Sequence, residues 1–193
     1  MQNPSIVFVV LCMMGCSHGH PAKEAVANEP TVAKQIDPNY GSEVLDVDSI
    51  LLNRSIPFRS SVDGITAVLG NPDSIVSTSH ECGGFFEVDQ VRNYYYGRTR
   101  FEVYGDTGVI RNIDIGDARF RLTAGSAHLD SRTSLANIGE LFPRSASQAY
   151  PIKDEAGKEV LLVRLKAEPS SDDVWVLHFQ DGHLVEVEYW IPC

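Results

Sequence analysis

The alternation of apolar and polar positions predicts most of the secondary structure of this chain. Phe101 and Val103 alternate with Arg100 and Glu102, and a period of two is typical of a half-buried strand. Similar runs predict strands over 91–96, 99–104, 109–115, 160–165, 175–179 and 185–189. Short turn signals, Gly97-Arg98 and Asp181-Gly182, separate neighbouring runs. We therefore expect antiparallel meanders.

Two other stretches carry apolar residues at helical spacing. The apolar positions are Val62, Ile65, Val68 and Leu69 in the first, and Leu135, Ile138, Leu141 and Phe142 in the second. Ser60 or Ser61 in the first, and Thr133 or Ser134 in the second, are suitable N-caps. An isolated helix of about three turns is marginal in water. We therefore expect both helices to lie with their apolar sides on a sheet.

These helices belong to a longer pattern that occurs twice. Ile65 and Leu69 match Ile138 and Phe142 at one constant offset, and a short apolar hairpin precedes each helix, over 49–58 and 122–129. A constant offset indicates an internal duplication. The sequence predicts an α+β fold of tandem duplicated units, repeat one over 48–116 and repeat two over 117–193. Each unit is expected to hold a short hairpin, one helix and a three-stranded antiparallel meander, with the helices packed on one sheet face.

The N-terminus predicts export and a lipid anchor. Residues 6–14 form an unbroken apolar run, far short of the ~20 residues that span a bilayer. The run ends at Gly15-Cys16, and a short apolar stretch before a small residue and a Cys resembles a lipoprotein signal peptide. We expect a signal peptide over 1–15, lipidation at Cys16 and a flexible tether over 16–47, because the tether has few apolar residues. A soluble exported protein and a buried apolar run are the alternatives.

Two cysteines remain in the rest of the chain. In an oxidising compartment Cys82 and Cys193 are expected to form a disulfide. A redox or metal site at His80-Glu81-Cys82 is the alternative, but it lacks the further ligands that zinc requires.

Charge and motifs narrow the function. The net charge of −10 and the pI near 4.9 argue against a nucleic-acid partner, since nucleic-acid binders need clustered positive charge. The sequence contains no nucleophile elbow, Walker A loop, H-E-x-x-H or C-x-x-C motif. We therefore expect no enzymatic activity, no metal and no small-molecule cofactor. An enzyme with unmarked carboxylates stays an alternative.

Aromatic residues are the candidates for binding. A run of tyrosines on one predicted strand, with neighbouring aromatics, offers amphipathic side chains of the kind favoured at protein interfaces. The candidate protein-binding residues are Tyr94, Tyr95, Tyr96, Phe85, Phe86 and Tyr104. Covering the second face of the sheet is the structural alternative.

The order of hairpin, helix and meander over 48–193 resembles the small envelope lipoproteins of the BamE/SmpA type, and also the two-repeat fold of β-lactamase inhibitor protein. This resemblance implies a non-enzymatic, periplasm-facing lipoprotein that binds another protein in an envelope assembly or accessory role. It would be anchored in the bacterial cell envelope at the outer membrane. An immunity or inhibitor lipoprotein that neutralises a toxin or enzyme is the alternative.

Overall fold

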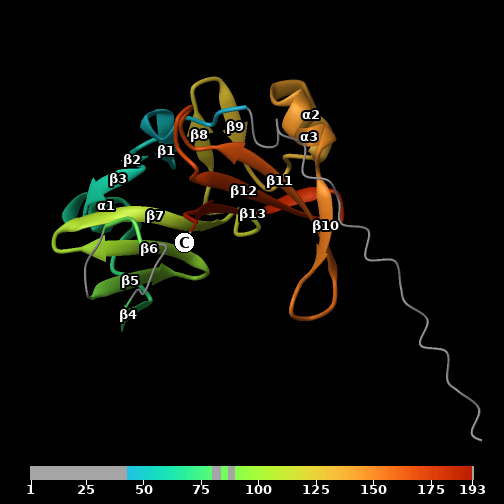
Figure 1. Cartoon of the computed structure of the whole chain (residues 1–193). Helices are drawn as coiled ribbons and strands as arrows, with labels where there is room; N and C mark the ends of the chain where they lie inside the picture. Colours follow the sequence, from blue (N-terminus) through green and yellow to red (C-terminus); the bar gives the residue numbers. More distant parts are fainter. Residues whose placement is uncertain (1–42, 80–83, 87–89, 193) are drawn as a thin grey trace, which may run out of the picture. The chain divides into compact units, whose positions relative to one another are not determined.

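The computed structural model of this chain describes residues 43–79, 84–86 and 90–192 (Figure 1). Cys16, Cys82 and Cys193, for which lipidation and a disulfide are expected, lie outside the described residues. The signal peptide and most of the tether lie outside them as well.

The described chain is mostly β-sheet with short helices. Its strands are β1 (Ile50–Leu52), β2 (Ile56–Pro57), β3 (Arg59–Ser61), β4 (Ser74–Thr78), β5 (Val91–Tyr96), β6 (Thr99–Tyr104), β7 (Thr107–Asp114), β8 (Leu122–Ala124), β9 (Ala127–Leu129), β10 (Tyr150–Lys153), β11 (Glu159–Lys166), β12 (Val174–Gln180) and β13 (His183–Trp190). Its helices are the 3-10 turn η1 (Val47–Ser49) and the α-helices α1 (Val62–Leu69), α2 (Leu135–Leu141) and α3 (Pro143–Ser147).

The strands form two antiparallel sheets. The large sheet has the order β10-β11-β12-β13-β7-β6-β5-β4, with β3 paired to β7 beside this path. The small sheet has the order β2-β1-β8-β9. In both sheets, the two halves of the chain meet at the centre, where β13 pairs with β7 and β1 pairs with β8. Strands from corresponding places in the two halves follow in the same order on either side of that centre. This is a symmetry of strand order, and the duplication of the sequence stays a prediction.

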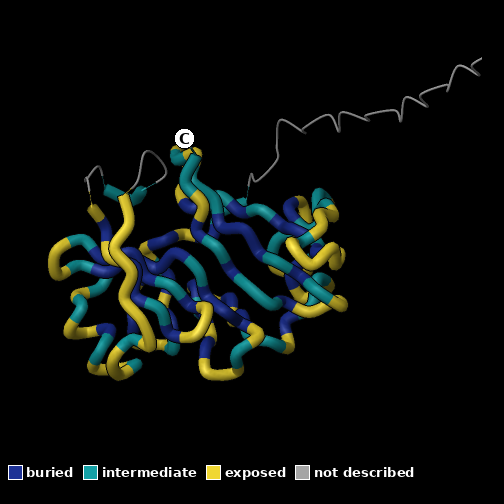
Figure 2. Tube along the Cα trace, turned by 90° about the horizontal axis from the view of Figure 1, so that it is seen from below, coloured by how far each residue is buried: buried dark blue, intermediate teal, exposed yellow. Residues whose placement is uncertain are grey.

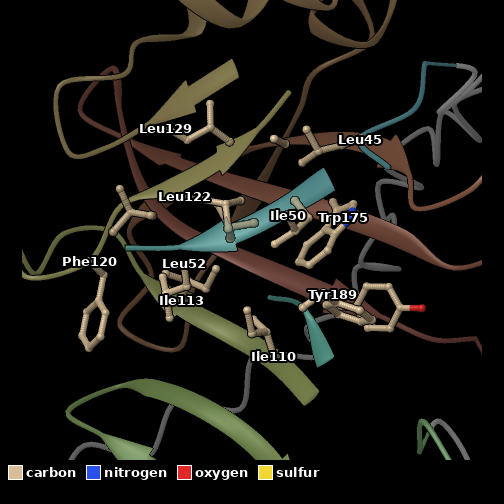
Figure 3. Close-up of a cluster of buried hydrophobic side chains, with 14 of the residues drawn as sticks. Leu45, Ile50, Leu52, Ile110, Ile113, Phe120, Leu122, Leu129, Trp175 and Tyr189 are labelled. Carbon is tan, nitrogen blue, oxygen red and sulfur yellow. The ribbon is translucent and has the colours of Figure 1, made fainter. Parts of the chain in front are cut away.

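The core lies between the two sheets. Figure 3 shows Leu52 and Leu122 of the small sheet above Ile113 of the large one, and all three are fully buried. Trp175 of β12 is also fully buried, within the same cluster. Because the two short hairpins are apolar on the side that faces the large sheet, they supply the second layer of the core.

The predicted α+β class, with helices packed on one sheet face, is therefore wrong. Among the apolar residues of α1 and α2, only Ile65 and Ile138 are buried, while Val68 and Leu141 are 45% and 41% exposed. Helices of two turns carry too little apolar surface to cover a sheet of this width. The hairpins occupy that place instead.

The helices nevertheless begin where capping predicts. Ser61 accepts a hydrogen bond from the backbone N–H of Gly64, and Ser134 and Asn137 form a capping box. The side chain of Ile65 lies directly on Gly108 of β7, where a Cβ would overlap the Ile65 Cδ1 atom. The glycine is thus required by the close approach of α1 to the sheet.

Each meander has four strands rather than the predicted three, because β4 and β10 extend the two outer ends. The strands over 91–96 and 99–104 begin and end where the alternation places them. The turns also follow the sequence, with Gly97 at φ 62° and with Asp181 and Gly182 at φ 52° and 82°. Among the described residues, no helix has the length and apolar character needed to cross a membrane.

Candidate functional site

The large sheet has a second face that points away from the small sheet. Opposite residues of paired antiparallel strands point to the same side, so the register defines this face directly. One row across the sheet is Tyr95, Arg100, Asn112, Glu188, Val176 and Arg164, and the next is Asp114, Glu186, His178, Leu162 and Tyr150. We call this surface the outer face. Figure 2 views the protein from below, the side opposite the small sheet.

The second half of the outer face has an apolar floor of its own. Val160, Leu162 and Val176 are only 6%, 6% and 4% exposed, and they form a cluster separate from the main core. Tyr150 and Val174 pack against this cluster and are half-buried.

Cationic and aromatic side chains stand beside this floor. The guanidinium carbon of Arg164 lies 5.7 Å from the centre of the Tyr150 ring and 5.5 Å from that of Trp190. Trp190 is 38% exposed and Ile152, on β10, is 37% exposed. Stacking of this kind is worth about 0.5–1 kcal/mol at exposed sites, and it restricts the rotamers of the three side chains.

The centre of the outer face is polar and internally bonded. Arg100 Nε donates to Asn112 Oδ1 at 3.1 Å, and Asn112 Nδ2 donates to Glu186 Oε1 at 2.7 Å. His178 Nε2 lies 3.4 Å from Glu188 Oε2. This contact with His178 is the main reason that the pKa of Glu188 is lowered. The centre therefore holds charges that are already compensated.

The first half of the outer face is covered by a short segment of the chain itself, residues 84–86. The backbone N–H of Phe85 donates to the hydroxyl of Tyr104 at 2.9 Å, and that hydroxyl donates to Glu102 Oε2 at 2.7 Å. Glu102 is fully buried, and its other oxygen lies 3.1 Å from Arg111 Nε. Burial, followed by the bond to Glu102, raises the pKa of Tyr104 to about 12. The segment is fixed by a buried charged network.

The structure separates the six aromatic residues chosen from the sequence. Tyr94 and Tyr96 are buried in the main core, and Tyr95 lies half-buried on the outer face. The remaining three form an inward-facing group with Arg59: Phe85 contacts Phe86, Phe86 contacts Tyr104, and the Arg59 guanidinium lies over both phenylalanine rings. They hold the covering segment in place and do not join Tyr95 in one surface.

Sequence reasoning missed the group around Arg164, although a signal existed. Residues 160–165 are apolar at every position except Arg164. A strand that is apolar on both sides indicates burial on both faces. Tyr150 could be added only from the pairing, which also places Tyr150 and Trp190, from strands β10 and β13, on either side of the floor.

Two hollows of about 260 Å³ each lie on the described surface outside the second half of the outer face. The first is lined by Val47, Asp48, Pro57, Phe58, Arg59, Phe85 and Glu168. The second is lined by Val44, Leu45, Asp46, Ser49, Ala124, Gly125, Ser126, Ala127, Leu141 and Phe142. Over the described ranges, no group of three or more His, Cys, Asp or Glu residues is arranged to hold a metal ion.

Comparison with known proteins places the chain in no family: no family model matches it, and neither a curated protein nor a solved structure matches it significantly. The resemblance to small envelope lipoproteins and to β-lactamase inhibitor protein stays a prediction.

Proposed function

We propose that this chain is a non-enzymatic, lipid-anchored protein of the bacterial envelope, and that its folded domain binds another protein. The contact surface is the second half of the outer face, comprising Tyr150, Val160, Leu162, Arg164, Val174, Val176 and Trp190. The observation that carries the proposal is the apolar floor there. It lies on the side of the large sheet away from the main core, and its rim includes an exposed tryptophan.

The chemistry of the rim fits a protein partner. Tryptophan, tyrosine and arginine are the residue types that contribute most to binding energy at protein interfaces. Because Arg164 is stacked between Tyr150 and Trp190, these side chains lose little conformational freedom when a partner binds. The rim is therefore suited to serve as the centre of an interface.

The charge of the chain favours a protein over a nucleic acid. The net charge of −10 repels a phosphate backbone, and the ionised groups at the centre of the outer face are engaged with one another. A partner that covers apolar surface and rim aromatics does not need to displace these charges.

The proposed anchor rests on the apolar run that ends at Gly15-Cys16. A flexible tether of the length between Cys16 and the first described residue, Glu43, has an average reach on the order of 30 Å. Such a tether would let the domain meet a partner close to the membrane surface.

Photo-crosslinking in cells tests the proposal. A photoreactive amino acid is placed at position 190 of the full chain, and at position 68 as the matched control, because Val68 is 45% exposed on α1. We expect a specific protein adduct from position 190 that is absent from position 68. A photoreactive residue at position 174, which lies opposite Trp190 in the register, should give the same adduct. Trp190→Ala should weaken the adduct formed from position 174.

Equal adducts from positions 190 and 68 would refute the assignment of the surface. Thermal unfolding of each variant, compared with the wild type, separates loss of contact from loss of fold.

A further inference from the structure

The strand β4 forms one end of the large sheet, and all five of its residues are exposed. Ile75 and Val76 are 52% and 44% exposed, and Ile75 is the most exposed large hydrophobic residue among those described. Figure 2 shows β4 as a continuous yellow tube at the surface. Exposure of this kind on a strand contrasts with the buried apolar residues of the inner strands.

An exposed edge strand presents backbone N–H and C=O groups that can pair with another chain, and proteins usually protect such edges with charges, proline or bulges. β4 has none of these features. Its sequence, Ser-Ile-Val-Ser-Thr, is uncharged, and its register with β5 is continuous from Ser74 to Thr78.

The opposite edge of the same sheet is protected. β10 contains Pro151, which has no N–H to donate, and ends in Lys153. The two ends of the small sheet, β2 and β9, are only two and three residues long. Among the described edges, β4 is thus the longest, and it is uncharged and regular in register.

We infer that β4 is a docking edge for an extended segment of another protein, which adds a strand antiparallel or parallel to it. The segment would carry β-branched residues at alternate positions and Lys or Arg near its ends. Main-chain hydrogen bonds would provide affinity, and the alternate side chains would provide specificity.

The two sides of the edge define what those side chains meet. On the outer side, the segment would contact Val76 and Thr78; the hydroxyl of Thr78 already accepts a hydrogen bond from Asn93 Nδ2 at 2.9 Å. On the inner side, it would contact Ile75, which lies opposite Tyr94 in the register. An apolar side chain of the added strand would therefore meet Val76 on the outer side of the sheet, and another would meet Ile75 on the inner side.

Size and charge favour a segment of another protein over a second copy of this chain. A five-residue strand is about 17 Å long, and pairing over that length buries far less than the roughly 1,200–2,000 Å² of a standard interface. Two copies, each with a net charge of −10, also repel one another. A basic segment is attracted by the same charge and can extend beyond the ends of β4.

A labelled peptide, Lys-Thr-Val-Thr-Val-Thr-Lys, tests this edge directly by fluorescence anisotropy with the full chain. The peptide is expected to bind the wild type, and alternate N-methylation of its backbone is expected to abolish binding. Val76→Lys should weaken binding by about tenfold or more, because a charge on the edge opposes strand addition. Val68→Lys is the matched control, with the same change of charge at a similarly exposed site, and should leave the affinity within about twofold of wild type.

Four results would overturn the inference. The first two are no binding to the wild type, and equal binding of the N-methylated peptide. The third is tighter binding after deletion of residues 17–42, which would show that the chain's own N-terminal segment occupies the edge. The fourth is a dimer by sedimentation that Val76→Lys dissociates, which would assign the edge to a second copy. None of these measurements involves Trp190, so this inference and the proposed function fail independently.

Discussion

The buried carboxylate of Glu102 gives the sharpest test of how the first half of the outer face is held together. Glu102 has no exposed surface, and it bonds Tyr104 at 2.7 Å and approaches Arg111 at 3.1 Å. Arg111 is itself only 7% exposed. Glu102→Gln keeps the shape of the side chain and removes its charge.

The magnitude follows from the charge that stays behind. Arginine does not deprotonate in proteins, so Arg111 would remain a buried cation without its carboxylate. Breaking a buried ion pair on one side costs about 3–5 kcal/mol, and we expect Glu102→Gln to lower the free energy of unfolding by that amount. Adding Arg111→Met should recover part of the loss, since it removes the buried cation that faced Glu102.

Glu102→Gln should also change how the free energy of unfolding depends on pH in the alkaline range. The pKa of Tyr104 rises from 10.0 to about 12 on folding, so its contribution is complete below pH 10 and is lost as the pH rises through 12. Removing the charge of Glu102 lowers this pKa, although burial, the larger cause, persists. The loss should therefore begin near pH 10 in both proteins, but end at a lower pH and be smaller in total in Glu102→Gln than in the wild type.

Urea unfolding followed by the fluorescence of the buried Trp175 measures the free energy, and amide exchange at Phe85 reports release of the covering segment. Glu188→Gln is the matched control, because it makes the same change on the same sheet face, at a side chain that is 29% exposed. If Glu102→Gln costs no more than Glu188→Gln, the buried network does not hold the segment as argued.

Three further predictions address other parts of the molecule. Gly108→Ala should destabilise the fold by about 1–3 kcal/mol in urea unfolding, because its Cβ would overlap Ile65, and adding Ile65→Ala should relieve part of this cost. The pKa of Glu188 is lowered below 4.5 mainly by His178, so the contribution of Glu188 to stability is present above pH 4.5 and is lost as the pH falls through the folded pKa. In His178→Asn, the free energy of unfolding should fall less steeply over this acid range. An unchanged pH dependence would contradict this prediction. Palmitate labelling in cells should mark the wild type and not Cys16→Ser, whereas labelling of both would remove the proposed anchor.

Local structure was accessible from the sequence because it depends on neighbours in the chain. Alternation located β5 and β6, and Gly97 marked the turn between them. Asp181-Gly182 marked the turn between β12 and β13, and Ser61 and Ser134 capped the two predicted helices. Each of these signals acts over a few residues.

The partner of each apolar surface was decided only by the tertiary structure. Ile65 and Val68 follow the same helical pattern in the sequence, yet one is fully buried and the other is 45% exposed. Ile65 is buried because Gly108 of β7, which is distant in the chain and has no Cβ, leaves room for its side chain. Periodicity identifies an apolar side but not what covers it, so the helices were assigned a place that the hairpins occupy.

The candidate site divides in the same way. The sequence determined a short strand pattern that is apolar on both sides at 160–165 and a tyrosine run whose members must alternate, but it did not predict the strand at 74–78. Only the strand order placed Trp190 and Tyr150 on either side of Arg164, and left β4 at the end of the sheet. Side-chain direction follows from the local backbone, whereas adjacency between strands is set by pairing across the whole chain.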